Sequence, residues 1–389
     1  MLTRTLQSIF EKALTETPKS LVLMGPRQTG KSTMLRCLSP HLTIDLADES
    51  TFQDHVKDPS LLRALCKTLP ENARVLVDEV QRVPSLLNTI QSILDSKQIL
   101  RFLLTGSSAR KLRRGHANLL PGRTFWYAMH PLTYWELRDR WNLVQALTTG
   151  TLPEVYLTEY GPDLLGHYIA TYLREEILAE SLTRNIGAYA RFLDVAAENS
   201  GRITNYSQLA SDTEIPKETL RRFYDILFDT LIVHRLPGYS DLKSKRKASQ
   251  KEVFLFFDMG VRNAVLRQHK NVFTATELGR LFEQWLINQI IAYNNYHQKD
   301  WSLFFYRDDQ KNEVDLVVDV GPHVIAVEIK YSASFKDDYV EGLNHFAEVC
   351  RKPCQRILVY RGDHVQQRDD VKVIPYETFL NETVPSFGQ

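Results

Sequence analysis

Cysteine is scarce in this chain, and its pattern argues against a common kind of metal site. The 389 residues include four cysteines. Cys350 and Cys354 lie four residues apart, without a second cysteine pair or a histidine doublet nearby, so a zinc site is not expected. Cys37 and Cys66 are isolated in the sequence. We therefore expect four reduced, structural thiols, which suits a protein of the cytoplasm.

Long apolar runs and net charge are also missing. No uninterrupted apolar stretch approaches the roughly 18–20 residues needed to cross a bilayer, so no membrane span is expected. Residues 1–21 have the charged pattern of an amphipathic helix rather than that of a secretory signal. The 48 lysines and arginines balance 47 aspartates and glutamates, so affinity for nucleic acid would have to come from local clusters.

The first third of the chain alternates short apolar runs with helical patterns. The runs predict strands, and the segments 32–38 and 85–95 between them predict helices. This alternation is typical of a parallel sheet with helices on both faces. The predicted strands are residues 20–24, 42–46, 74–77, 101–105 and 125–129.

A glycine-rich segment follows the first predicted strand and has the G-x-x-x-x-G-K-S pattern of a phosphate-binding loop. The glycines let the backbone wrap phosphate oxygens, and the N–H groups at the start of the next helix point toward the anion. We expect Lys31 to bridge the β- and γ-phosphates of ATP and Ser32 to ligate Mg²⁺. The alternative is a chance match at a strand-to-helix junction. The predicted nucleotide-binding residues are Gly25, Pro26, Arg27, Gln28, Thr29, Gly30, Lys31, Ser32 and Thr33.

Two adjacent carboxylates, Asp78 and Glu79, end the third predicted strand. Asp78 is expected to hold Mg²⁺, directly or through water, and Glu79 to orient the attacking water. The alternative, two surface acids at a strand end, is weakened by the phosphate-binding loop about 50 residues earlier.

The fourth predicted strand ends at Thr105, and Ser107 and Ser108 follow. Hydroxyls at this edge of the sheet are candidates to sense the γ-phosphate, Ser107 first among them; the alternative is a strand ended by small turn residues. Basic residues come next. We select Arg123 from them as an arginine finger toward a neighbouring subunit of a homo-oligomer, with a solvated basic loop as the alternative.

At this point the residues resemble a known family. The loop 25–32 and the segments 78–81, 104–108, 120–123 and 131–133 are similar to the AAA-14 type of AAA+ ATPase. The segments 152–155 and 172–177, with the later E-V-D and E-I-K segments, resemble the DUF4143 region that usually follows it. The resemblance implies ATP binding and an AAA+ sheet of strand order 5-1-4-3-2.

The middle of the chain carries a helix-turn-helix pattern at residues 206–227. Predicted strands at 231–236 and 253–257 would form a wing. Basic side chains on the second helix and near the wing tip could neutralise phosphates of DNA, duplex or branched. Winged-helix folds also bind proteins, and basic runs are often simply solvated. The candidate DNA-binding residues are Lys217, Arg221, Arg222, Lys245, Arg246 and Lys247.

The last third contains a nuclease-like pattern. Asp315 lies on one predicted strand, and Glu328 and Lys330 lie two residues apart on the next, which resembles the PD-(D/E)xK arrangement. Period-two geometry puts Glu328 and Lys330 on one face. Asp315 and Glu328 are candidate Mg²⁺ ligands, Lys330 could help activate water, and Glu283 on the preceding helix is a further candidate acid. The alternative is a nuclease-like fold that has lost its chemistry.

Together these patterns predict an α/β protein of three regions. The first region, residues 1–145, is an AAA+ P-loop ATPase domain; the second, 146–270, is helical with a winged helix; the third, 271–389, is an α/β restriction-endonuclease-like domain. The leading hypothesis is a cytoplasmic, Mg²⁺-dependent ATPase that acts on DNA. The alternative is an ATP-dependent switch that binds a protein partner through an inactive nuclease-like region.

Overall fold

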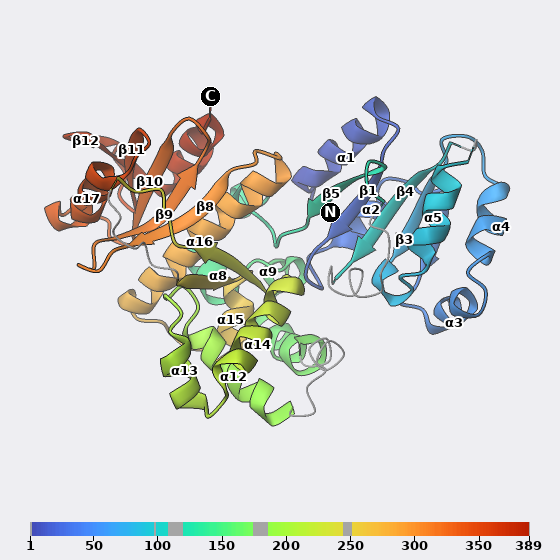
Figure 1. The fold of residues 1–389 in the computed structure, drawn as a ribbon, viewed down its shortest axis with the longest axis horizontal. Helices are drawn as coiled ribbons and strands as arrows, with labels where there is room; N and C mark the ends of the chain where they lie inside the picture. Colours follow the sequence, from blue (N-terminus) through green and yellow to red (C-terminus); the bar gives the residue numbers. More distant parts are fainter. Residues whose placement is uncertain (1, 97–98, 108–119, 174–185, 244–250, 389) are drawn as a thin grey trace.

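The computed structural model describes residues 2–96, 99–107, 120–173, 186–243 and 251–388 (Figure 1). A five-stranded sheet and its helices stand at one end of the molecule, and a six-stranded sheet stands at the other. The helices of the second region lie below and between them. Within the described residues, no helix is long and apolar enough to cross a membrane.

The first sheet is parallel throughout and has the strand order β2-β3-β4-β1-β5, which confirms the predicted order. Its strands are buried on both faces, as apolar runs in a parallel sheet require. Because the strands are parallel, their carboxyl ends meet at one edge. The strands are β1 (Ser20–Met24), β2 (Leu42–Asp45), β3 (Arg74–Asp78), β4 (Arg101–Gly106) and β5 (Thr124–Ala128).

Alternate side chains of β1 supply two separate apolar cores. Val22 and Met24 point to the side covered by α5, whereas Leu21 and Leu23 point to the side covered by α1 and α2. The helix predicted for residues 85–95 is present as α5. The helices of this region are α1 (Thr5–Glu16), α2 (Lys31–Arg36), α3 (Glu49–Lys57), α4 (Leu61–Lys67) and α5 (Leu86–Leu94).

The second region is mainly helical. The helix predicted for residues 161–184 is α-helical only at α10 (Gly161–His167) and continues as a wider π-helical turn at Tyr168–Leu173, so the prediction of one regular α-helix is wrong there. The remaining elements around it are α7 (Tyr134–Leu137), α8 (Leu143–Thr148), α9 (Pro153–Leu157), α12 (Ile186–Glu198) and α15 (Met259–Val265).

The helix-turn-helix and hairpin pattern is present in the second region. α13 (Tyr206–Thr213) and α14 (Lys217–Asp229) are joined through Glu214, whose backbone is left-handed at φ 57°. The antiparallel strands β6 (Val233–Pro237) and β7 (Glu252–Phe256) follow. The ring of Tyr224 on α14 stacks on Phe254 of β7, with centroids 4.1 Å apart, and fixes the helix on the hairpin.

The third region packs one long helix on a mixed sheet of order β12-β13-β11-β10-β9-β8. Helix α16 (Ala275–Tyr296) covers one face and α17 (Glu341–Val349) covers the other. The core beneath α16 also includes Leu132, Leu137 and Leu147, so the segment after β5 is packed into the third region. The strands are β8 (Ser302–Arg307), β9 (Glu313–Asp319), β10 (Val324–Lys330), β11 (Cys354–Tyr360), β12 (Gln366–Arg368) and β13 (Val371–Pro375).

Two histidines face each other where the regions meet. The rings of His130 and His234 have centroids 5.5 Å apart. Burial lowers the pKa of His234 to about 4. Burial, with smaller contributions from His234 and Arg4, holds the pKa of His130 well below its usual value. Both imidazoles are therefore neutral in the folded chain near neutral pH.

This histidine pair predicts acid lability. An unfolded histidine takes up a proton below about pH 6.5, whereas folded His234 stays neutral down to about pH 4. Stability is therefore lost as the pH falls through this window, by about 3 kcal/mol for His234 alone. Melting temperatures measured from pH 7.5 to 4 should show a steep fall that is shallower in His234→Phe. An equally steep fall in that variant would contradict the assignment.

Candidate active site

The loop between β1 and α2 forms a cradle that only certain residues can build. Gly30 has φ 91°, a left-handed conformation that favours glycine. A Cβ on Gly25 would lie 2.6 Å from the carbonyl oxygen of Met129, so a larger residue does not fit there. Thr29 is buried, and its hydroxyl donates to the carbonyl of Pro26 at 2.9 Å, which closes the loop on itself.

Lys31 and the start of α2 turn the cradle into a cationic pocket. The Lys31 ammonium donates to the carbonyls of Gly25 and Pro26, each at 2.8 Å, and its side chain is almost fully buried. No side chain caps the N-terminus of α2, so its first N–H groups remain available to an anion. The cleft in front of the loop has a volume of about 490 Å³, which suits a nucleotide. The residues present thus fit a bound triphosphate.

Asp78 lies at the carboxyl end of β3, opposite the start of α2. Its Oδ1 accepts a hydrogen bond from the Ser32 hydroxyl at 2.9 Å and another from the Thr105 hydroxyl on the neighbouring strand β4. Its other oxygen lies 3.9 Å from the Arg36 guanidinium. The structure therefore brings together Ser32 and Asp78, the pair proposed from the sequence as Mg²⁺ ligands, and a hydroxyl and a carboxylate are ligands that Mg²⁺ accepts.

Glu79 is held next to Asp78 by a network that the sequence only partly indicated. Its backbone is left-handed at φ 57°, and its N–H donates to the Thr105 hydroxyl at 3.0 Å. Its carboxylate accepts from the amide of Gln81 and, at 3.4 Å, from the hydroxyl of Ser107. Gln81 also donates to Ser107 at 3.0 Å. Ser107 thus lies where predicted, but Thr105 is the hydroxyl that contacts both acids.

Gln81 is a site residue that sequence reasoning had not singled out. The D-E-V-Q segment was the signal that could have found it. The short 3-10 turn at Val80–Arg82 points its amide back toward β4. Arg36 and Arg82 were also missed. Both line the cleft, and Arg82 is anchored to the carbonyl of Leu46 at 2.5 Å.

Arg123 does not join this site. It lies just before β5, at the opposite end of the sheet from the cradle, because its carbonyl accepts from the N–H of Ser20 at the start of β1. Its guanidinium forms two hydrogen bonds to Asp95, at 2.7 and 3.1 Å. A finger role would require another subunit to meet this edge. The candidate Ser108 lies outside the described residues.

The basic candidates of the second region are only partly described. Lys217, Arg221 and Arg222 are exposed on α14. Arg221 pairs with Glu218 at 3.2 Å, and its guanidinium lies 5.2 Å from the centre of the Tyr206 ring. Lys245, Arg246 and Lys247 lie outside the described residues.

Four predicted residues of the third region converge beneath α16. The antiparallel register of β9 and β10 pairs Leu316 with Val327, which brings Asp315 opposite Glu328 one position further on. The N–H of Ile329 donates to Asp315 at 2.7 Å, and Lys330 forms an ion pair with Glu328. Glu283 approaches from α16, because its charge acts on the other two carboxylates.

Burial and mutual repulsion disfavour the charged carboxylates in this cluster. Burial first, and then the neighbouring Asp315, raise the pKa of Glu328 to about 8. The same causes raise the pKa of Glu283 well above its usual value. One oxygen of Glu328 is buried without a hydrogen-bond partner among the described residues. Among those residues, no group of three or more His, Cys, Asp or Glu side chains has the arrangement of a metal site.

The parallel sheet, the cradle and the paired acids define a P-loop nucleotide-binding domain. Residues 17–138 match the family model of an AAA domain, AAA_14, so the first region is an AAA-type ATPase domain. Residues 140–271 and 278–379 match two domains of unknown function, DUF8612 and DUF4143. The segments 152–155 and 172–177, which we compared with DUF4143, therefore fall in the DUF8612 match instead.

Relatives along the whole chain are similar but unassigned. The chain is 25% identical over 384 residues to the uncharacterized proteins Rv2008c of Mycobacterium tuberculosis and Mb2031c of Mycobacterium bovis, covering 95% of this chain and 83% of each of them. Among solved structures, the Walker-type ATPase PABY2304 of Pyrococcus abyssi matches with a TM-score of 0.48 and 16% identity, over 68% of this chain and 96% of its own.

The carboxylate cluster predicts that removing one charge will stabilise the metal-free protein. Asp315→Asn keeps an oxygen for the N–H of Ile329 but relieves repulsion on Glu283 and Glu328. A raised folded-state pKa means that stability is lost as the pH rises from about 4.5 toward 8. Melting at pH 8 with a chelator should therefore occur a few degrees higher in the variant.

Asp319→Asn on the same strand is the matched control for this prediction. It removes a partner of Lys352, which lies 2.6 Å away, and should not raise the melting temperature. A lower melting temperature for Asp315→Asn at pH 8 would show that this carboxylate is a structural anchor rather than one of a repelling group.

Proposed function

We propose that this protein is a Mg²⁺-dependent ATP hydrolase whose cycle acts on DNA through the second and third regions. The observation that carries the ATPase part is the arrangement of Ser32, Asp78 and Thr105, in which two hydroxyls from separate elements meet on one buried carboxylate oxygen. This is the constellation that a metal–triphosphate complex requires beside a phosphate cradle.

Each described residue of the cleft has a part in this proposal. Bound Mg²⁺ would neutralise charge on the β- and γ-phosphates, with Ser32 and Asp78 as its protein ligands. Lys31 supplies the cation inside the cradle. Glu79 orients the attacking water, and Gln81 and Ser107 hold its carboxylate in place. Phosphoryl transfer depends mainly on such positioning and charge stabilisation.

Two substitutions separate binding from turnover. Lys31→Ala should abolish ATP binding, because it removes the cation of the cradle. Glu79→Gln should still bind ATP but hydrolyse it at least about 100-fold more slowly, because the amide cannot act as a base. Nucleotide titration and phosphate release measure the two effects. Lys12→Ala, on the exposed face of α1, is the control. Wild-type turnover in Lys31→Ala would overturn the assignment.

The DNA part of the proposal rests on α14 and on the carboxylate cluster. Lys217, Arg221 and Arg222 give the second helix of a helix-turn-helix an exposed basic face. Asp315 and Glu328, with Lys330 beside them, have the chemistry of a metal-dependent phosphodiesterase site. ATP-driven changes in the first region would regulate how these two surfaces engage DNA.

DNA-stimulated ATP turnover tests this part. Duplex and branched DNA should raise the rate, and the effect should weaken steeply with salt. Replacing Lys217, Arg221 and Arg222 by alanine should flatten the salt dependence by up to about 0.9 per lost phosphate contact in a plot of log affinity against log salt. Lys372→Ala, an exposed lysine on β13, is the control.

Two outcomes would redirect the proposal. No DNA affinity at low salt would favour a nucleotide switch that binds a protein partner. If DNA binds but no duplex, branched or single-stranded substrate is cut with Mg²⁺ or Mn²⁺, the third region is not a nuclease. Cleavage that is lost in Asp315→Ala while ATP turnover persists would establish it as one.

A further inference from the structure

We propose that Arg4 is a positioning residue of the phosphate cradle and that Tyr296, at the end of α16, makes the cradle's geometry depend on the third region. This inference rests on the proposed ATP function. It concerns a buried guanidinium that joins segments far apart in the sequence, outside every motif that identified the nucleotide site.

Arg4 precedes α1 and uses its whole guanidinium in buried contacts. Its Nη1 donates to the carbonyl of Thr29 at 2.6 Å. Its Nη2 donates to the carbonyl of His130 at 2.8 Å and to the Tyr296 hydroxyl at 3.3 Å. Its Nε lies 3.0 Å from the carboxylate of Glu136. One cation therefore links the cradle, the segment after β5 and α16.

The contact with Thr29 acts on the peptide immediately before Lys31. The carbonyl and N–H of a trans peptide point in opposite directions. Holding the Thr29 oxygen toward Arg4 therefore turns the N–H of Gly30 to the other side. Gly30 lines the nucleotide cleft and is the left-handed residue that starts α2. The orientation of this peptide decides whether its N–H is available to a phosphate oxygen.

Glu136 fixes the guanidinium from the far side. The N–H of Thr5 donates to one of its oxygens at 2.8 Å, and the N–H of Thr133 donates to the other at 3.0 Å. Both side chains of the Arg4–Glu136 pair are almost fully buried. An arginine fork held in this way has one geometry, and a lysine cannot reproduce it.

Tyr296 brings the third region to this point. It is the last residue of the 22-residue helix α16, and it packs into the apolar core of α1 and the first sheet. Its hydroxyl accepts from Arg4 and, at 3.1 Å, from the N–H of His130. Asn295, the residue before it, contacts the His130 ring at 2.8 Å. The end of α16 is therefore built into the support of the cradle.

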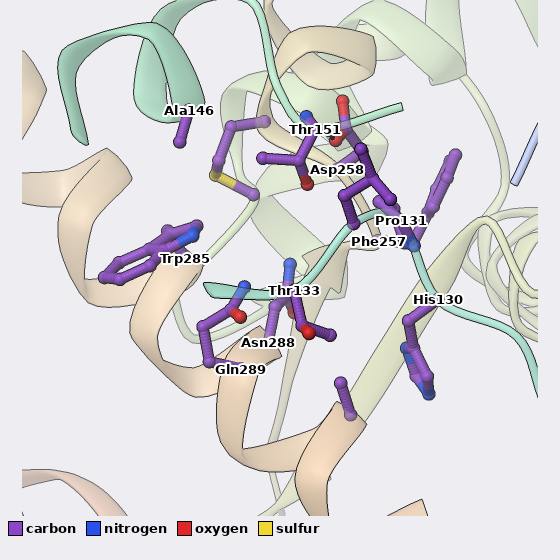
Figure 2. Close-up of a pocket in the computed structure, with 13 residues that line it drawn as sticks. His130, Pro131, Thr133, Ala146, Thr151, Phe257, Asp258, Trp285, Asn288 and Gln289 are labelled. Atoms are coloured by element: carbon purple, nitrogen blue, oxygen red, sulfur yellow. Dashed lines mark hydrogen bonds between the residues drawn. The ribbon is translucent and has the colours of Figure 1, made fainter. Parts of the chain in front are cut away.

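The same helix is fixed along its length to the other regions. Gln289 accepts from the N–H of Tyr134 at 2.8 Å, and Asn288 donates to the carbonyl of Phe256 at 2.8 Å. Figure 2 shows Asn288 and Gln289 projecting from α16 toward Thr133 and the strand-like segment that carries it. Glu283 of the carboxylate cluster lies 13 residues before Tyr296, about 20 Å along a helix that rises 1.5 Å per residue.

The physical consequence is a link between nucleotide and α16. If a bound triphosphate changes the Thr29–Gly30 peptide, Arg4 transmits the change to Tyr296. A shift of α16 caused at the carboxylate cluster acts on the cradle in return, because coupling between two sites is reciprocal. The segment 130–136 gives both ends a common anchor.

Hydrogen–deuterium exchange of the full chain, with and without the slowly hydrolysed analogue ATPγS and Mg²⁺, tests the link. In the wild type, nucleotide should slow exchange both in the loop 25–33 and in the last turns of α16. In Tyr296→Phe, which loses only the hydroxyl, the loop should still be protected and the α16 response should be lost. Tyr156→Phe, which removes another hydrogen-bonded hydroxyl, should behave as the wild type.

Arg4→Lys provides the kinetic test and the fallback if Tyr296→Phe does not fold. It keeps the charge beside Glu136 but loses the fork, so KM for ATP should rise at least about tenfold while kcat changes less than about threefold. Arg262→Lys, whose arginine contacts the carbonyl of Ala197 instead, is the matched control. Equal losses of kcat and KM effects in both variants would mean general destabilisation and would overturn the positioning role.

The outcomes distinguish this inference from the function beneath it. Protection of the loop without any response in α16 of the wild type would overturn the link and leave the ATPase intact. A response in α16 that persists in Tyr296→Phe would also overturn it. Absence of nucleotide protection in the loop itself would overturn the proposed ATP function, and this inference with it.

Discussion

The buried contact between Arg4 and Glu136 determines how the rest of the molecule is assembled. Without its partner, either charge would carry a large desolvation cost inside the protein. Burial opposes the charge of Arg4, but Glu136 outweighs this and raises its pKa overall. The pair also satisfies carbonyls that would otherwise be buried without donors, at Thr29 and His130. The first sheet, the segment after it and α16 therefore share one polar centre.

A second constraint, the parallel order of the first sheet, explains why the nucleotide site could be predicted at all. Parallel strands bring their carboxyl ends to one edge, so the ends of β1, β3 and β4 meet regardless of how far apart they lie in the sequence. Local patterns located those ends well: the glycine-rich loop, the acid pair after β3 and the hydroxyl residues after β4. The strand order itself came from resemblance, because no periodicity distinguishes one buried strand from another.

What could not be predicted are the residues whose roles depend on distant contacts. Arg4 meets Thr29 across 25 residues and Tyr296 across 292, and nothing in a charged amphipathic helix indicates that its first arginine is buried. Thr105 was one of three hydroxyl candidates, and only the spacing of β3 and β4 decides that it contacts both acids. Helix α16 begins earlier than predicted because Thr274 and Glu277 form a capping box, a signal that the local sequence did contain.

The carboxylate cluster and the nucleotide cleft differ in how their charges are compensated. In the cleft, hydroxyls and a guanidinium surround Asp78, so the carboxylate is stabilised by the protein alone. Beneath α16, Lys330 is the cation that opposes three carboxylates, and one oxygen of Glu328 has no partner among the described residues. Such under-compensated acids destabilise a fold unless another positive group arrives. A cation or a basic ligand that binds there would therefore stabilise the sheet on which α16 rests, and through Tyr296 it would act on the same helix that supports the phosphate cradle.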